Sequence, residues 1–267
     1  KKIIRMLKKR IIPKFLFQFR EINGALLPTF VISKKFSELK MMGSIIPQAK
    51  IYEAQLADEL MILYIEDKQC SKDPEFLSFL KKFSEQIFMP LTVGGGVKTL
   101  DCFEKLLNNG ADKVFINSEA INNPDLIKKA SEKFGSQCVV LGIDFREIEK
   151  DKFAVFSKGG KINTNLDLFK WTKKCEDLGA GEILVNDIDR DGTSSGLNIK
   201  IAKKISELLS IPLIFSGGCG LASHFVEGFK NTDIDAISAG TFFAKKDQNI
   251  FQLRSQILNS GINLRQV

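Results

Sequence analysis

Gly181-Glu-Ile-Leu-Val-Asn-Asp-Ile-Asp-Arg-Asp-Gly-Thr193 joins an apolar run of strand length to an acidic turn. Ile183, Leu184 and Val185 have the pattern of a buried strand, and three aspartates and a glycine follow them. An α/β barrel builds its active site from such groups, because the carboxyl ends of its strands meet at one face. A solvated acidic turn would have the same local sequence. The segments on either side must therefore distinguish these two interpretations.

Apolar runs of strand length alternate with helix-period segments along the chain, and this pattern predicts βα units around a parallel sheet. Strands are expected near residues 10–17, 59–65, 90–93, 113–116, 138–144, 182–185, 211–215 and 236–239. Helices are expected near residues 46–56, 74–86, 100–108, 124–134, 166–178, 199–209, 222–229 and 250–260. Two longer connections, residues 18–43 and 147–163, are expected to be irregular loops at the catalytic face. Eight such units in 267 residues predict a single (β/α)8 TIM barrel domain over residues 1–267.

A weak internal repeat divides the chain into two halves. Residues 92–96 (TVGGG) precede residues 111–118 as residues 214–218 (IFSGG) precede residues 234–241. The interval from Gly96 to Asn117 equals the interval from Gly218 to Ala239. Duplicated half-barrels would give this symmetry.

Glycines directly after barrel strands let backbone N–H groups approach an anion without a Cβ in the way. The loops after the seventh and eighth strands, the usual phosphate site of such barrels, contain Gly217, Gly218, Ala239 and Gly240. Their counterparts in the first half of the chain are Gly95, Gly96, Asn117 and Ser118. Each glycine pair alone fits a tight turn equally well. Two pairs at equal spacing favour a phosphorylated small molecule with two anionic groups.

Carboxylates stand between these two expected anion sites. Asp144 ends the fifth strand, and Asp187, Asp189 and Asp191 follow the sixth. Asp144 should point into the barrel mouth and is a candidate general acid or base. The alternative is a structural carboxylate held by the neighbouring Arg146.

Composition excludes several classes of protein. The net charge of +7 comes from lysines spread along the chain without interleaved aromatics, so an anionic small ligand or an acidic partner is favoured over nucleic acid. No apolar run reaches membrane-spanning length, and the basic residues 1–10 lack the features of a signal peptide. Five scattered cysteines without CxxC spacing predict reduced thiols in the cytoplasm. With His224 as the single histidine, neither a metal site nor a cofactor is expected.

The motifs taken together resemble the cyclase subunit of imidazole glycerol phosphate synthase over nearly the whole chain. The matching segments are residues 10–13 (RIIP), 57–60 (ADEL), 92–96 (TVGGG), 111–114 (ADKV), 116–117 (IN), 179–183 (GAGEI), 188–193 (IDRDGT) and 216–218 (SGG). The resemblance implies a barrel that docks a glutaminase subunit at the face where its strands begin. It also implies that ammonia passes along the barrel interior and reacts at the other end with a ribulosyl carboxamide ribotide that carries two phosphates.

The resemblance also assigns roles to individual positions. It implies that Asp144 and Asp191 are catalytic. It implies phosphate binding by Gly96, Asn117, Ser118, Gly192, Gly218, Ala239 and Gly240. It further implies a gate of alternating charges at the tunnel entrance, made of Arg10, Glu59, Lys113 and Glu182.

Departures from the family pattern are concentrated near the first strand. Leu16 stands where the family has a catalytic aspartate, and Tyr64 replaces another acid. The connection after the first strand also differs, and its Lys34 and Lys35 do not align with a ligand-binding lysine of the family. Loss of an acid typically removes a factor of about 10²–10⁴ from a rate.

Three functions therefore remain. The first is a paralogous amidotransferase subunit that passes ammonia from a glutaminase to a separate, sugar-amidating enzyme, and this interpretation is favoured. The second is an active cyclase of histidine biosynthesis in which another acid, such as Glu21, replaces the missing one. The third is a non-catalytic scaffold for the glutaminase, which the retained Asp144 and paired anion sites disfavour.

Overall fold

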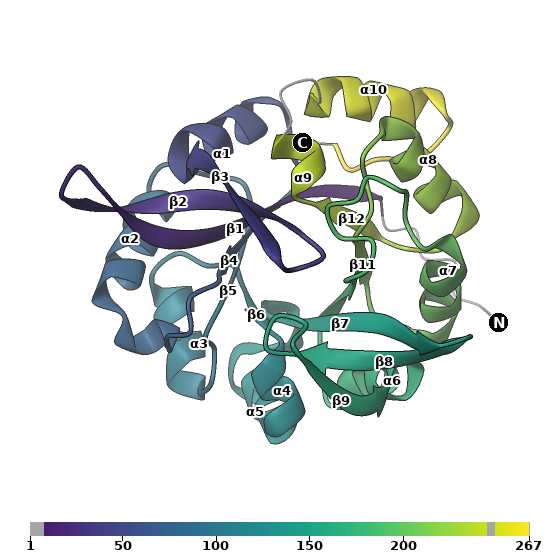
Figure 1. Cartoon of the computed structure of the whole chain (residues 1–267), viewed down its shortest axis with the longest axis horizontal. Helices are drawn as coiled ribbons and strands as arrows, with labels where there is room; N and C mark the ends of the chain where they lie inside the picture. Colours follow the sequence, from purple (N-terminus) through teal and green to yellow (C-terminus); the bar gives the residue numbers. More distant parts are fainter. Residues whose placement is uncertain (1–7, 245–248, 267) are drawn as a thin grey trace.

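The computed structural model describes residues 8–244 and 249–266, which form a closed parallel barrel with helices around it (Figure 1). The barrel strands are β1 (Arg10–Ile22), β4 (Leu60–Tyr64), β5 (Leu91–Gly94), β6 (Lys113–Ile116), β7 (Val139–Glu149), β10 (Glu182–Asp187), β11 (Leu213–Ser216) and β12 (Ala236–Ala239). Neighbours pair in parallel, and β12 closes the barrel on β1. The (β/α)8 barrel prediction is confirmed, and each strand begins within two residues of its expected start.

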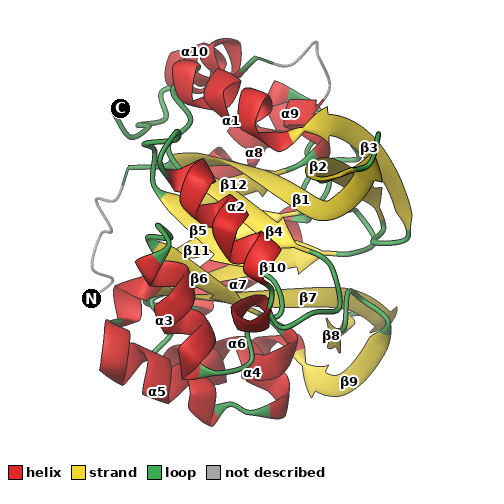
Figure 2. Cartoon of the chain, turned by 90° about the vertical axis from the view of Figure 1, so that its left-hand side faces the viewer, coloured by secondary structure: helices red, strands yellow, loops and turns green. Residues whose placement is uncertain are grey.

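Helices cover the outside of the barrel (Figures 1 and 2). They are α1 (Ile45–Ala54), α2 (Pro74–Ser84), α3 (Leu100–Asn108), α4 (Ser118–Asn122), α5 (Asp125–Phe134), α6 (Leu168–Asp177), α7 (Ile199–Leu208), α8 (Ala222–Asn231), α9 (Thr241–Ala244) and α10 (Ile250–Asn259), with short 3₁₀ turns at Cys70–Lys72 and Ser136–Cys138. In the described ranges, no helix is long and apolar enough to cross a membrane. Of the basic segment 1–10, residues 1–7 lie outside these ranges.

The two connections predicted to be irregular loops are ordered antiparallel extensions, so that prediction is wrong. β1 continues to Ile22 and turns back into β2 (Ala25–Lys34), which pairs with β3 (Glu38–Ser44). β7 continues to Glu149 and is followed by β8 (Lys152–Ser157) and β9 (Ile162–Asp167). Tight turns with positive φ at Asn23 and Asp151 make these pairings possible. Figure 2 shows both extensions at the same end of the barrel.

Side chains that alternate along the strands fill the barrel interior. A compact inner cluster contains Ile12, Met61, Leu63, Phe115, Val140, Leu184, Ile214 and Ala236, and we call it the apolar layer. A second, much larger cluster joins the outward faces of the strands to the helices. The apolar layer thus separates two polar regions, one at each end of the barrel.

Candidate active site

Four charged side chains meet inside the barrel at the end where its strands begin. Arg10 Nη1 lies 2.9 Å from Glu59 Oε2, and Arg10 also pairs with Glu182. Lys113 Nζ lies 2.9 Å from Glu59 Oε2 and 3.0 Å from Glu182 Oε2. Each cation bridges both carboxylates, so the charges alternate and cancel. The structure therefore brings together all four residues predicted as the gate, and we call them the charged ring.

Opposite charges within the ring favour the charged forms of Arg10 and Glu182, although both residues are largely buried. Burial raises the pKa of Glu182, but the charges of Arg10 and Lys113 outweigh burial and leave this pKa below its ordinary value. Burial lowers the pKa of Arg10, but Glu182 and Glu59 leave it above its ordinary value. Thr92 Oγ1 also donates a hydrogen bond of 2.6 Å to Glu59 Oε1. Removing one member would leave a buried unpaired charge, which typically costs about 3–5 kcal/mol.

Asp144 lies at the opposite end of the barrel, where β7 leaves it. Its Oδ2 accepts a 2.6 Å hydrogen bond from Asn117 Nδ2 on the loop after β6. Burial raises the pKa of the Asp144 carboxyl to about 6, against the lowering effects of the Asn117 hydrogen bond and the Lys14 charge. Arg146 instead pairs with Asp189 at 3.6 Å, so the interpretation of Asp144 as its structural partner is not supported. A carboxyl that titrates near neutral pH is suited to general acid–base chemistry.

Lys14 is a functional candidate that the sequence reasoning missed. Its side chain is buried inside the barrel, and Nζ donates to Ser216 Oγ at 3.0 Å and to Asn186 Oδ1 at 3.3 Å. The signal was available, because Arg10, Ile12 and Lys14 alternate along β1 and must share its inner face. Lys14 therefore places a cation between the strand ends that carry the predicted anion loops.

The second predicted anion site is assembled from three segments. A cavity of about 10 Å³, roughly the room of one water molecule, is lined by Asp191, Gly192, Ser216, Gly217, Gly218, Cys219, Ala239, Gly240 and Thr241. Gly217 and Gly218 have φ of 100° and 102°, values that disfavour other residues. Asp191 accepts a 2.6 Å hydrogen bond from Ser33 Oγ of β2. Five predicted site residues thus line one small cavity, and β2 holds the acidic turn against it.

The first predicted anion site is less clearly formed. Gly96 has φ of 60°, and a Cβ there would lie 1.9 Å from the Lys68 carbonyl oxygen, so only glycine fits. Ser118 Oγ accepts a hydrogen bond of 2.9 Å from the Lys158 backbone N–H, beyond the end of β8. The side chain of Asn117 is committed to Asp144 through its nitrogen, and its buried Oδ1 has no partner. Phosphate binding by Gly96, Asn117 and Ser118 stays a prediction.

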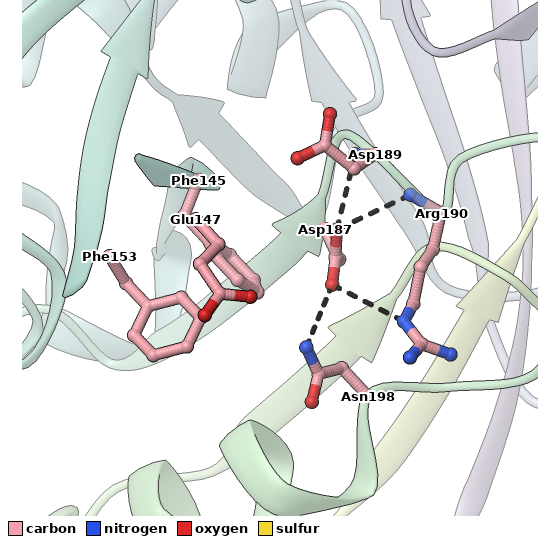
Figure 3. Close-up of a pocket in the computed structure, with 7 residues that line it drawn as sticks. All are labelled: Phe145, Glu147, Phe153, Asp187, Asp189, Arg190 and Asn198. Atoms are coloured by element: carbon pink, nitrogen blue, oxygen red, sulfur yellow. Dashed lines mark hydrogen bonds and ion pairs between the residues drawn. The ribbon is translucent and has the colours of Figure 1, made fainter. Parts of the chain in front are cut away.

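A separate cavity of about 110 Å³ lies beside the acidic turn (Figure 3). It is lined by Phe145, Glu147, Phe153, Asp187, Asp189, Arg190 and Asn198. Figure 3 shows Asp187 directed at Arg190 and Asn198. Its Oδ1 accepts from the backbone N–H groups of Asp189 and Arg190 at 3.1 and 3.3 Å, and its Oδ2 accepts from Asn198 Nδ2 at 3.1 Å. Asp187 therefore stabilises the acidic turn. Of the three aspartates in this turn, Asp191 lines the small cavity formed by the glycine loops after β11 and β12.

The two substituted positions, Leu16 and Tyr64, and the candidate replacement acid, Glu21, lie in three different settings. Leu16 follows Lys14 by two residues along β1 and so faces the barrel mouth with an apolar side chain. Tyr64 packs outward, stacked on Phe76 of α2 with centroids 4.7 Å apart, and its hydroxyl donates to Asp73 at 2.7 Å. Glu21 is exposed near the end of the β1–β2 hairpin, about 16 Å along the strand from Leu16. Neither Tyr64 nor Glu21 supplies an acid to the mouth.

Comparison with known proteins adds an independent finding. The family described as "Histidine biosynthesis protein" matches residues 29–248. A protein of Prochlorococcus marinus (strain MIT 9313), provisionally named imidazole glycerol phosphate synthase subunit hisF2, is 44% identical over 97% of this chain and 99% of its own length. The imidazole glycerol phosphate synthase subunit HisF of Hydrogenobaculum sp. (strain Y04AAS1) is 42% identical over 97% of this chain and 100% of its own. HisF of Clostridium botulinum (strain Okra / Type B1) is 39% identical with the same coverage.

Proposed function

The chain belongs to the family of imidazole glycerol phosphate synthase HisF subunits, and from this membership we propose that it is the barrel subunit of a glutamine-dependent amidotransferase. A glutaminase subunit docks at the charged ring and releases ammonia into the barrel. The ammonia leaves at the mouth for a second enzyme, one that amidates a sugar. The chain is thus a paralogue of the histidine-pathway subunit.

The single observation that carries this proposal is a complete charged ring beneath an altered mouth. Arg10, Glu59, Lys113 and Glu182 form every bridge that an alternating ring of four charges allows. At the mouth, Leu16 stands in place of an acid, and Lys14 adds a buried cation. The machinery for receiving ammonia is therefore kept while the machinery for cyclisation is changed.

The chemistry proposed for the mouth is binding and proton exchange. Asp144, whose pKa is about 6, can accept or return a proton near neutral pH. Lys14 and the backbone N–H groups of Gly218 and Gly240 supply positive potential for an anionic group of the acceptor. Cyclisation of the ribulosyl ligand would need a second acid opposite Asp144, and Leu16 cannot transfer a proton.

The first experiment tests the docking of a glutaminase. The full chain is co-expressed with a glutaminase subunit from the same genome, and complex formation is measured by analytical ultracentrifugation. Lys113→Glu should abolish the complex, because it places a third carboxylate beside Glu59 and Glu182. Lys133→Glu is the matched control, since Lys133 is an exposed lysine paired with Glu104 at 2.7 Å. The proposal fails if no complex forms with the unmodified chain.

The second candidate is an active cyclase, which one observation favours. HisF of Hydrogenobaculum is 42% identical over nearly full length, and Asp144 and Asp191 both lie at the mouth. A histidine-requiring strain that lacks only the cyclase separates the candidates. Growth of this strain without histidine, when it expresses the chain, would establish the cyclase and refute the paralogue.

A further inference from the structure

The inner face of β6 presents three side chains of different chemistry on the way through the barrel. Lys113 belongs to the charged ring, Phe115 to the apolar layer, and Asn117 bonds Asp144 at the mouth. Alternate residues of a strand are about 6.6 Å apart, so Phe115 stands midway between the two polar regions. Anything that passes from the charged ring to Asp144 must pass the level of Phe115.

Phe115 has an unusual place in the apolar layer. Most of its members, which include Ile12, Met61 and Leu184, are at most 2% exposed, whereas Phe115 is 8% exposed and Leu63 is half-buried. Solvent therefore reaches Phe115 and Leu63, while the other side chains of the apolar layer are sealed. Phe115 and Leu63 together form the boundary between the sealed interior and the side of the layer that water reaches.

Two glycines make room for the Phe115 ring. A Cβ on Gly142 of β7 would lie 2.1 Å from Phe115 Cζ, and a Cβ on Gly94 of β5 would lie 2.8 Å from Phe115 Cδ1. Neither glycine has positive φ, so backbone conformation does not require glycine at these positions. The absent side chains are explained by the ring, which extends over both neighbouring strands.

The strand registers identify what faces the ring across the barrel. Followed around the closed barrel, they put Gly94 and Gly142 on one level with Lys14 and Ser216, as expected when alternate strands contribute to each layer. Lys14 Nζ is hydrogen-bonded to Ser216 Oγ at 3.0 Å. At this level the interior is therefore filled by an aromatic ring from one side and by a bonded lysine–serine pair from the other.

We propose that Phe115 is a selectivity plug, a side chain that blocks the barrel interior and admits only small neutral molecules. This inference rests on the proposed transfer of ammonia. The ring closes the passage at rest and moves aside for a small neutral molecule. A cation is excluded twice, because the apolar layer cannot solvate it and Lys14 repels it. Ammonia crosses and ammonium does not.

Thiol labelling tests the plug without requiring a glutaminase or an acceptor. Met61→Cys puts a thiol in the apolar layer, at a position 0% exposed. Propyl methanethiolsulfonate is neutral, and aminoethyl methanethiolsulfonate is a cation of nearly equal size. The rate at position 61 is followed by peptide mass spectrometry, which separates it from the five native cysteines. Both reagents should react slowly with the Met61→Cys chain.

Adding Phe115→Ala should raise the rate of the neutral reagent roughly ten-fold or more, because truncation joins the sealed layer to the solvent-reached edge. The cationic reagent should gain much less. Phe103→Ala is the matched control, since Phe103 is a buried ring of α3 outside the barrel, stacked on Phe134. It should leave both rates unchanged. Phe115→Leu replaces the alanine variant should the latter lose its fold, with a smaller gain for the neutral reagent.

Two outcomes overturn the plug. Equal acceleration by Phe103→Ala would show that the thiol is reached by general loosening of the fold. Equal acceleration of both reagents would show that the passage does not select against charge. Failure of the glutaminase to bind, by contrast, would overturn the proposed function and leave the labelling result as it stands.

Discussion

Gly142→Ala should destabilise the protein through one identifiable clash. The new Cβ would lie 2.1, 2.7 and 2.9 Å from three atoms of the Phe115 ring, well inside van der Waals contact. The ring also lies close to β5 on its other side, since a Cβ on Gly94 would lie 2.8 Å from Phe115 Cδ1. Overpacking of this kind costs about 1–3 kcal/mol of unfolding free energy. Phe115→Ala alone should cost about 3–5 kcal/mol by leaving a cavity.

The two substitutions together should cost no more than Phe115→Ala alone. Without the ring, the methyl group of Gly142→Ala has room, and an alanine also restricts the unfolded chain. The expected coupling energy is therefore about 1–3 kcal/mol in favour of the double variant. Urea unfolding followed by circular dichroism gives the midpoint and slope for all four proteins. Phe225→Ala is the control for Phe115→Ala, because Phe225 of α8 packs against Phe242 outside the barrel. The loss of unfolding free energy caused by Phe225→Ala should add to the loss caused by Gly142→Ala. If the losses of unfolding free energy from Gly142→Ala and Phe115→Ala are additive, the proposed clash between the new methyl group and the Phe115 ring is refuted.

Three further predictions concern the mouth. The folded-state pKa of Asp144, about 6, lies above its unfolded value, so ionising this carboxyl destabilises the folded protein as pH rises through 6. Asp144→Asn should therefore increase the free energy of unfolding by up to about 3 kcal/mol at pH 7.5, measured as a higher melting temperature. This gain should vanish towards pH 4. A small bisphosphorylated sugar should raise the melting temperature by mass action, and Gly218→Val, whose Cβ would meet the Gly196 carbonyl oxygen at 2.1 Å, should abolish that shift; an unchanged shift would exclude the glycine-loop site. Lys14→Met should weaken the same shift while leaving the glutaminase complex intact by ultracentrifugation, and loss of that complex would contradict the separation of the two ends.

Sequence alone predicted the barrel because strand and helix periods alternate clearly and because glycines and aspartates follow the strands. The members of the charged ring were predicted from the family resemblance, and each of them lies at or beside the start of a strand. The extensions from β1 and β7 were missed because their pairing depends on local turns at Asn23 and Asp151, although buried apolar residues such as Val31 of β2 and Val155 of β8 gave a strand signal. Lys14 was missed because the alternation along β1 was not followed inward from Arg10. The packing of Phe115 against Gly94 and Gly142 could not be predicted, because the two glycines lie on different strands and are distant in sequence from each other.

The apolar layer also insulates the two ends of the barrel from each other. The charged ring has no net charge, and about 13 Å of strand separates Glu182 from Asn186, the residue that holds Lys14. Because the ring is neutral as a whole, a cation or an apolar residue introduced at the mouth changes the electrostatic energy of the charged ring very little. The charged ring can therefore stay unchanged while side chains at the mouth are replaced, so the two ends of the barrel can diverge independently of each other.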